Sequence, residues 1–157
     1  MVKYTQVDKL KSATFKSLGS IPSKTICKPF LKWAGGKTQL IPELSKYVPA
    51  SFNKYIEPFI GGGAFFFHLN PLKAIIADLN EELIITYKAV QQHVEEVINT
   101  LRTFKNEESF YYQLRATEPS TLISVERAAR LIYLMACIES TKRDNLMSLM
   151  AKRTEIF

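Results

Sequence analysis

The sequence predicts an α/β domain with a parallel sheet, and two observations indicate this class. First, the strand-forming segment 54–59 (KYIEPF) is followed by three glycines and a short helical segment, 64–69. Second, another strand, 73–80 (KAIIADLN), precedes a long segment whose apolar residues recur at helical spacing. The order strand, glycine turn, helix, strand, helix opens many α/β domains. With 157 residues, the chain has the length of one ordinary domain or of part of a larger one.

Helices are expected before and after this strand pair in the sequence. After the apolar-aromatic segment 29–36 (PFLKWAGG), a helix should begin at Lys37 or Thr38. Asn80, followed by two acids, is a typical helix start, and apolar residues follow one helical face from there to Leu101. Further helices are predicted over 108–116 and 124–134.

The composition indicates a cytoplasmic protein that binds polyanions. The net charge of +6 favours nucleic acid as a partner, because neutralising phosphates releases counterions. A soluble protein that happens to be basic is the alternative. The only cysteines, Cys27 and Cys137, argue against a disulfide scaffold, and no apolar run approaches the roughly 18–20 residues of a membrane span. Residues 1–27, with five lysines and one acid, are predicted to form a flexible basic leader.

The glycine turn has a specific chemical use. Gly61, Gly62 and Gly63 remove the Cβ atoms that would hold a ligand away from the backbone. At the end of the next strand, Asp78 is able to accept hydrogen bonds from both hydroxyls of a ribose, which is how Rossmann-like folds bind nucleosides. The alternative is a tight turn without a ligand, with Asp78 capping the following helix.

Three stretches together resemble the opening motifs of the Dam-type DNA adenine-N6 methyltransferases: FLKWAGGK (30–37), EPFIGGGAFFF (57–67) and IADLN (76–80). These S-adenosylmethionine-dependent enzymes carry their cofactor motif first, then a target-recognition region, then the catalytic motif. The resemblance runs from about Pro29 to Leu134.

The resemblance implies a domain organisation. Residues 28–104 would be the N-terminal portion of a Rossmann-like S-adenosylmethionine-dependent methyltransferase fold. Residues 105–134 would be the start of a helical target-recognition domain. The implied partner is double-stranded DNA, and a monomer is expected. No metal is expected, because His68 and His93 lack other ligands at metal spacing.

Carried over position by position, the resemblance also implies a binding site for S-adenosylmethionine. The segment before the first strand would fold over the methionine end of the cofactor, a glycine turn would cradle it, and an acid would hold the ribose hydroxyls. Simpler roles remain open: a core tryptophan, a solvated lysine and a helix-capping acid. The implied site residues are Trp33, Lys37, Phe59, Gly61, Gly63 and Asp78.

The catalytic motif of this family is absent from the chain. Methyl transfer to a flipped-out adenine needs an Asp-Pro-Pro-Tyr-like motif that holds the amino group and stacks on the base. No such motif occurs here, and no proline follows Pro119. We therefore assign no catalytic residue and expect the chain alone to be inactive. A non-catalytic module that binds S-adenosylmethionine or DNA, or a methyltransferase part completed by a second chain, are the alternatives.

The last segment, 135–157, departs from the family pattern. Read one base upstream with permissible codons, it gives Asn-Gly-Met-Tyr-Arg-Val-Asn and, further on, Phe-Asn-Val-Pro-Tyr-Gly, which closely matches the expected continuation. We predict a frameshift near Met135 and a non-native tail, with a native short tail as the alternative. An apolar face of the second strand would then lie uncovered, so marginal stability and aggregation are expected.

Overall fold

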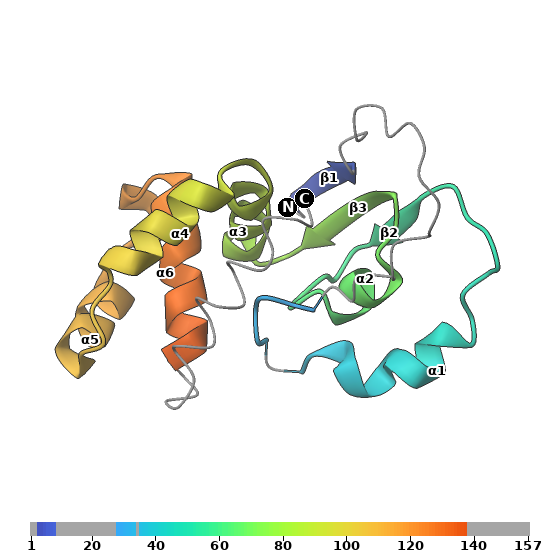
Figure 1. The fold of residues 1–157 in the computed structure, drawn as a ribbon, viewed down its shortest axis with the longest axis horizontal. Coiled ribbons are helices and arrows are strands. Elements are labelled where there is room, and N and C mark those ends of the chain that lie inside the picture. Colours follow the sequence, from blue (N-terminus) through green and yellow to red (C-terminus); the bar gives the residue numbers. More distant parts are fainter. Residues whose placement is uncertain (1–2, 9–27, 34, 138–157) are drawn as a thin grey trace, which may run out of the picture.

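The computed structural model describes residues 3–8, 28–33 and 35–137, and its centre is a three-stranded sheet in the order β1-β3-β2 (Figure 1). Strands β2 (Tyr55–Glu57) and β3 (Lys73–Asp78) run parallel, with Ile56 opposite Ile75. Strand β1 (Lys3–Asp8) runs antiparallel to β3. The α/β class and the parallel pair are confirmed, and the sheet as a whole is mixed.

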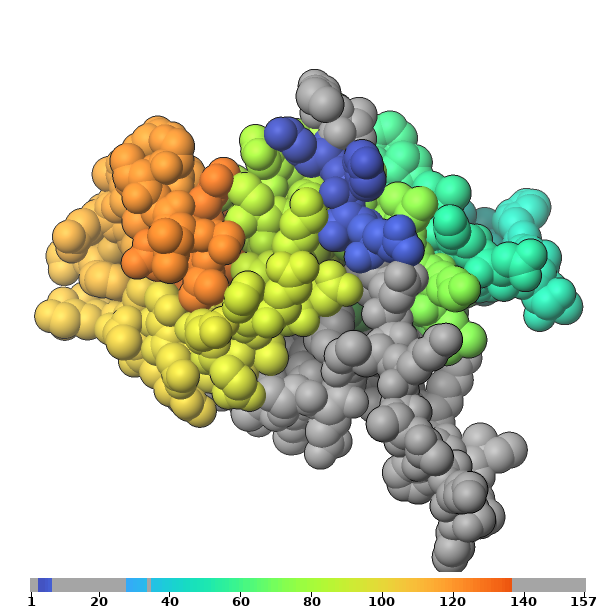
Figure 2. Space-filling view, turned by 90° about the horizontal axis from the view of Figure 1, so that it is seen from above, coloured from blue at the N-terminus to red at the C-terminus, as the bar shows by residue number. Residues whose placement is uncertain are grey.

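Strand β1 corrects the prediction of a flexible leader over its six residues. The segment KYTQVD contains β-forming Tyr4, Thr5 and Val7, and Thr5 is buried on the sheet. Pairing with β3 satisfies backbone groups that would otherwise lie at an open edge. The space-filling view shows β1 (blue) as a surface strand (Figure 2). The rest of the predicted leader, 9–27, lies outside the described residues.

The predicted helices form close to their expected positions. Asn80 caps α3, since its side chain accepts the Glu82 N–H at 3.0 Å. Helix α6 continues three residues past Leu134, into the predicted tail, of which 138–157 lie outside the described residues. The helices are η1 (Lys37–Leu40), α1 (Ile41–Ser45), α2 (Ala64–Leu69), α3 (Glu81–Gln92), α4 (Val94–Thr103), α5 (Glu108–Ala116), η2 (Pro119–Thr121) and α6 (Ser124–Cys137).

The prediction of a single helix from Asn80 to Leu101 is wrong, because the helix is interrupted at His93. The backbone of His93 leaves helical geometry (φ −139°, ψ 38°), ending α3 and starting α4. The apolar pattern continues across the break because α3 and α4 both pack against α6, and Figure 1 shows both helices beside α6. The apolar periodicity therefore reflects the packing of α3 and α4 against the same helix, α6, and does not indicate one continuous helix.

The core joins the sheet to the helices through one continuous apolar cluster. Ile76 of β3 and Leu83, Ile84 and Ile132 of the helices are almost fully buried. Since side chains alternate along strands, Ile56 belongs to the opposite face of the sheet, where it is 62% exposed. Tyr4 of β1 lies on the same face and is also exposed, whereas Ile75 of β3, which is paired with Ile56, is half-buried. No helix among the described residues is long and apolar enough to cross a membrane.

Candidate functional site

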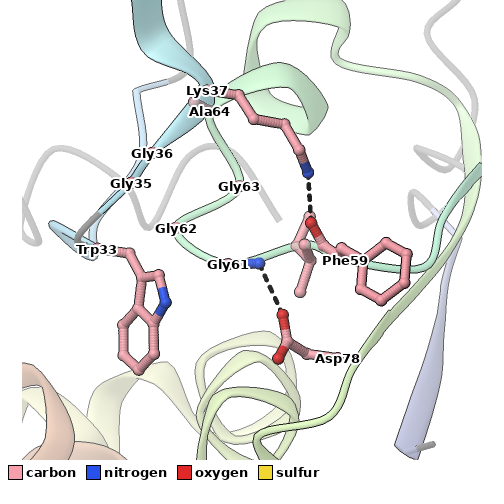
Figure 3. Close-up of a pocket in the computed structure, with 11 residues that line it drawn as sticks. Trp33, Gly35, Gly36, Lys37, Phe59, Gly61, Gly62, Gly63, Ala64 and Asp78 are labelled. Carbon is pink, nitrogen blue, oxygen red and sulfur yellow. Dashed lines mark hydrogen bonds between the residues drawn. The ribbon is translucent and has the colours of Figure 1, made fainter.

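A pocket opens where the chain leaves the carboxyl ends of β2 and β3 (Figure 3). Its volume of about 270 Å³ is close to the lower end of the roughly 300–1,000 Å³ typical of ligand pockets. The structure brings all six residues implied by the resemblance to this one place. The lining residues are Trp33, Gly35, Gly36, Lys37, Phe59, Ile60, Gly61, Gly62, Gly63, Ala64 and Asp78.

The glycine turn forms the wall of the pocket and needs its glycines. Gly61 and Gly63 have positive φ angles of 49° and 74°, which side-chain-bearing residues rarely adopt. A Cβ atom on Gly62 would lie 2.9 Å from the Leu31 carbonyl oxygen. The turn is tied to β3 by the Ile60 N–H, which donates to the Ala77 carbonyl at 2.9 Å. Its backbone is therefore held in place before any ligand binds.

Asp78 connects this turn to the start of α3. One carboxylate oxygen accepts the Gly61 N–H at 2.9 Å, and the other accepts the Asn80 N–H at 2.9 Å. The helix-capping alternative is thus realised only in part, because the cap itself is the Asn80 side chain. A carboxylate has about four acceptor positions, so each oxygen of Asp78 retains one for a ligand.

Lys37 lies in η1 and reaches the end of β2. Its Nζ atom is 2.6 Å from Glu57 Oε1 and also donates to the Phe59 carbonyl. Phe59 lines the pocket, but its ring is largely exposed. Trp33 is half-buried and packs beside the turn, with its Cδ1 atom 3.4 Å from the position of a Cβ on Gly61.

Three residues that support the pocket were missed at the sequence level. Glu57 is buried and binds Lys37, Tyr55 donates to Glu57 Oε2 at 2.7 Å, and Tyr87 donates to the Gly61 carbonyl at 3.0 Å. Burial, together with the Glu57 carboxylate, raises the pKa of Tyr55. An acid at the end of a strand of apolar and aromatic residues is the signal that could have identified Glu57. The described residues contain no cluster of metal-ligating side chains.

The fold and pocket define a mixed α/β protein in which a glycine turn and a strand-end carboxylate line one pocket. Comparison with known families then identifies the family of the chain. Residues 33–144 match the model of the D12 class N6 adenine-specific DNA methyltransferases. The chain belongs to this family, which confirms the resemblance seen in the sequence motifs.

Relatives of the chain include type II methyltransferases and DNA adenine methylases. The chain is 42% identical over 119 residues to the type II methyltransferase M1.LlaDCHI of Lactococcus lactis subsp. cremoris and 38% identical over 140 residues to the type II methyltransferase M.MjaIII of Methanocaldococcus jannaschii. It is 35% identical over 120 residues to the DNA adenine methylase of Haemophilus influenzae. These alignments cover 72%, 75% and 73% of the chain, but 42%, 48% and 42% of the relatives. The chain therefore spans less than half of each relative's length.

The family match ends nine residues beyond Met135, inside the segment for which we predict a frameshift. The frameshift and the division at residues 27, 104 and 134 remain predictions.

Proposed function

We propose that this chain is the S-adenosylmethionine-binding part of a DNA adenine-N6 methyltransferase, with a Rossmann-like arrangement of its strands. One observation carries the proposal: the Asp78 carboxylate is bound to the Gly61 N–H and retains an acceptor position on each oxygen. This arrangement suits the two adjacent hydroxyls of a ribose. Trp33 and Lys37 line the same pocket.

The remaining groups of the pocket also suit this cofactor. Lys37 is able to donate to the carboxylate of the methionine part, and the ring face of Trp33 attracts a cation such as a sulfonium. The glycine turn exposes backbone where a Cβ would obstruct a ligand. When bound, the cofactor supplies an activated methyl group.

The residues of this chain hold the methyl donor, and none of them presents adenine. The family reaction transfers the methyl group to the exocyclic nitrogen of an adenine in double-stranded DNA, which requires an Asp-Pro-Pro-Tyr-like motif that this sequence lacks. The net charge of +6 supports contact with DNA phosphates. The chain alone is accordingly expected to bind S-adenosylmethionine without methylating DNA.

Cofactor binding is directly measurable, because Trp33 is the only tryptophan of the chain and lies in the pocket. Titration with S-adenosylmethionine should change its fluorescence in a saturable way. Asp78→Ala should abolish the change. Glu96→Ala, an exposed acid on α4 outside the pocket, is the matched control and should bind like wild type. A folded wild-type chain that gives no binding signal here or by calorimetry refutes the proposal.

A second candidate is a methyltransferase completed in trans by another chain. It is favoured by the lack of an Asp-Pro-Pro-Tyr-like motif in this sequence. Transfer of labelled methyl groups to double-stranded DNA should be measured with the chain alone, with cell extract and with extract alone. Transfer only when chain and extract are combined would support completion in trans. Transfer by the purified chain alone would contradict the absence of a catalytic group.

A further inference from the structure

We propose that Glu57 is a positioning residue that aims the ammonium group of Lys37 at the carboxylate of the ligand's amino-acid part. This inference rests on the proposed binding of S-adenosylmethionine, and it assigns a role to a residue that touches Lys37 rather than the ligand. It explains why a buried carboxylate ends strand β2.

Glu57 is held rigidly where it lies. Its side chain is 6% exposed, and a buried carboxylate is costly unless it is paired and hydrogen-bonded. Both of its oxygens are engaged: Oε1 lies 2.6 Å from Lys37 Nζ, and Oε2 accepts the Tyr55 hydroxyl at 2.7 Å. The carboxylate is therefore fixed from two sides, and it does not line the pocket.

This fixed carboxylate restricts Lys37. A lysine side chain is flexible, and ordering it costs rotamer entropy. The Lys37 ammonium has three N–H donors, of which one meets Glu57 and a second meets the Phe59 carbonyl. These two acceptors, at the two ends of the segment 57–59, fix the direction of the third N–H. Lys37 lines the pocket and is 34% exposed, so this third donor remains available to a ligand carboxylate.

Two nucleosides separate this role from a general effect on the fold. S-adenosylhomocysteine and methylthioadenosine share the adenosine and a neutral thioether sulfur, but only the former has an amino-acid part. Their affinities should be measured on the same sample by Trp33 fluorescence and calorimetry. If part of a sample is unfolded, both apparent affinities fall by the same factor, so their ratio still reports on the pocket.

Wild type should bind S-adenosylhomocysteine more tightly than methylthioadenosine. Glu57→Gln should reduce this preference about tenfold through weaker S-adenosylhomocysteine binding, because a charge-assisted hydrogen bond is then misdirected. Lys37→Gln should reduce it similarly, and the double variant should lose no more than Lys37→Gln alone. Tyr55→Phe removes one of the two groups that hold Glu57 but keeps its charge, so it should reduce the preference by less than Glu57→Gln does.

Two results would overturn the inference while leaving the proposed function intact. In the first, Glu57→Gln weakens both nucleosides equally, which indicates a structural role. In the second, Glu57→Gln leaves the preference for S-adenosylhomocysteine unchanged, although Lys37→Gln removes that preference. If wild type binds neither nucleoside, the proposed function fails and this inference fails with it.

Discussion

The Asp78 carboxylate accepts the backbone N–H of Gly61 at 2.9 Å, and this hydrogen bond joins the end of β3 to the turn that follows β2. The acid proposed to bind the ribose therefore also shapes the turn beside which the ribose would lie. Its second oxygen connects to the start of α3 through the Asn80 N–H. Binding and local stability are coupled at this residue, so a test of either must measure both.

Asp78→Asn should weaken S-adenosylmethionine binding by roughly 10- to 100-fold and lower the free energy of unfolding by about 1–3 kcal/mol. The amide nitrogen cannot accept a hydrogen bond, so one of the two backbone N–H groups, of Gly61 or Asn80, loses its partner. Asn80→Ala is the control: it removes the helix cap, at a cost of about 1 kcal/mol, but retains the backbone N–H. Urea unfolding and ligand titration should be run on both variants. Equal losses of affinity would show that Asp78 acts only through stability.

Gly63→Ala should destabilise the protein by about 2–5 kcal/mol, well beyond Gly35→Ala. The two glycines have φ angles of 74° and 73°, so backbone strain of about 1–2 kcal/mol applies to both. A Cβ on Gly63 would lie 2.7 Å from the Tyr87 hydroxyl and 3.0 Å from the Phe67 ring, whereas a Cβ on Gly35 would meet nothing within 4 Å. Urea unfolding measures the difference, which is the packing contribution. Similar losses in the two variants would contradict the close packing behind the turn.

The parts of the fold with local signals were predictable from the sequence. The glycine turn, the strand ending in Asp78 and the helix start at Asn80 each depend on a few adjacent residues, and each was found where it was expected. The pocket residues were implied by the resemblance of three motifs to a known family, and all six line one pocket. Lys37 is an example: its motif assigned it to the site, although its partner Glu57 lies 20 residues later in the sequence.

The parts that depend on distant partners were not predictable. Strand β1 forms because β3, about 70 residues later, offers an edge, and its lysine-rich surroundings hid the short strand pattern. The break at His93 left the apolar periodicity intact, since α3 and α4 share α6 as their partner. The Glu57–Lys37 ion pair likewise connects two elements whose contact has no local signature.

Tyr55→Phe should lower stability at neutral pH by about 1 kcal/mol, because Glu57 loses a hydrogen-bond donor. Burial and the Glu57 carboxylate raise the pKa of Tyr55 above its ordinary value, so the folded state holds this proton more tightly than the unfolded state. Below about pH 10 the hydroxyl is protonated in both states and its contribution to stability is complete. Above that pH Tyr55 ionises in the unfolded state, and the contribution of its hydroxyl to the free energy of unfolding falls by about 1.4 kcal/mol per pH unit.

The stability difference between wild type and Tyr55→Phe should therefore narrow above about pH 10. Denaturant unfolding at several alkaline pH values measures this difference and cancels the titration of groups that the two proteins share. A difference that stays constant from neutral to alkaline pH would refute a raised pKa at Tyr55.

Arg127 and Glu82 should show an interaction energy of about 1–2 kcal/mol in a double-mutant cycle. Arg127 Nε lies 3.3 Å from Glu82 Oε2 and its guanidinium also donates to Oε1, which joins α6 to α3 by a two-pronged contact. Both side chains are 21% exposed, so salt screens the pair less than a surface pair. These hydrogen bonds raise the pKa of Arg127, and it stays charged throughout the usual pH range.

The matched control is the exposed pair Lys46–Glu43, whose side chains are 67% and 56% exposed. Its interaction energy should be about 0.2–1 kcal/mol and should fall at high salt. Arg127→Lys should lose most of the Arg127–Glu82 energy, because an ammonium cannot form the planar two-pronged contact. Urea unfolding at low and high salt provides all of these values. If the Arg127–Glu82 energy is no larger than that of the control pair, or is equally salt-sensitive, then the contact between α3 and α6 depends on apolar packing alone.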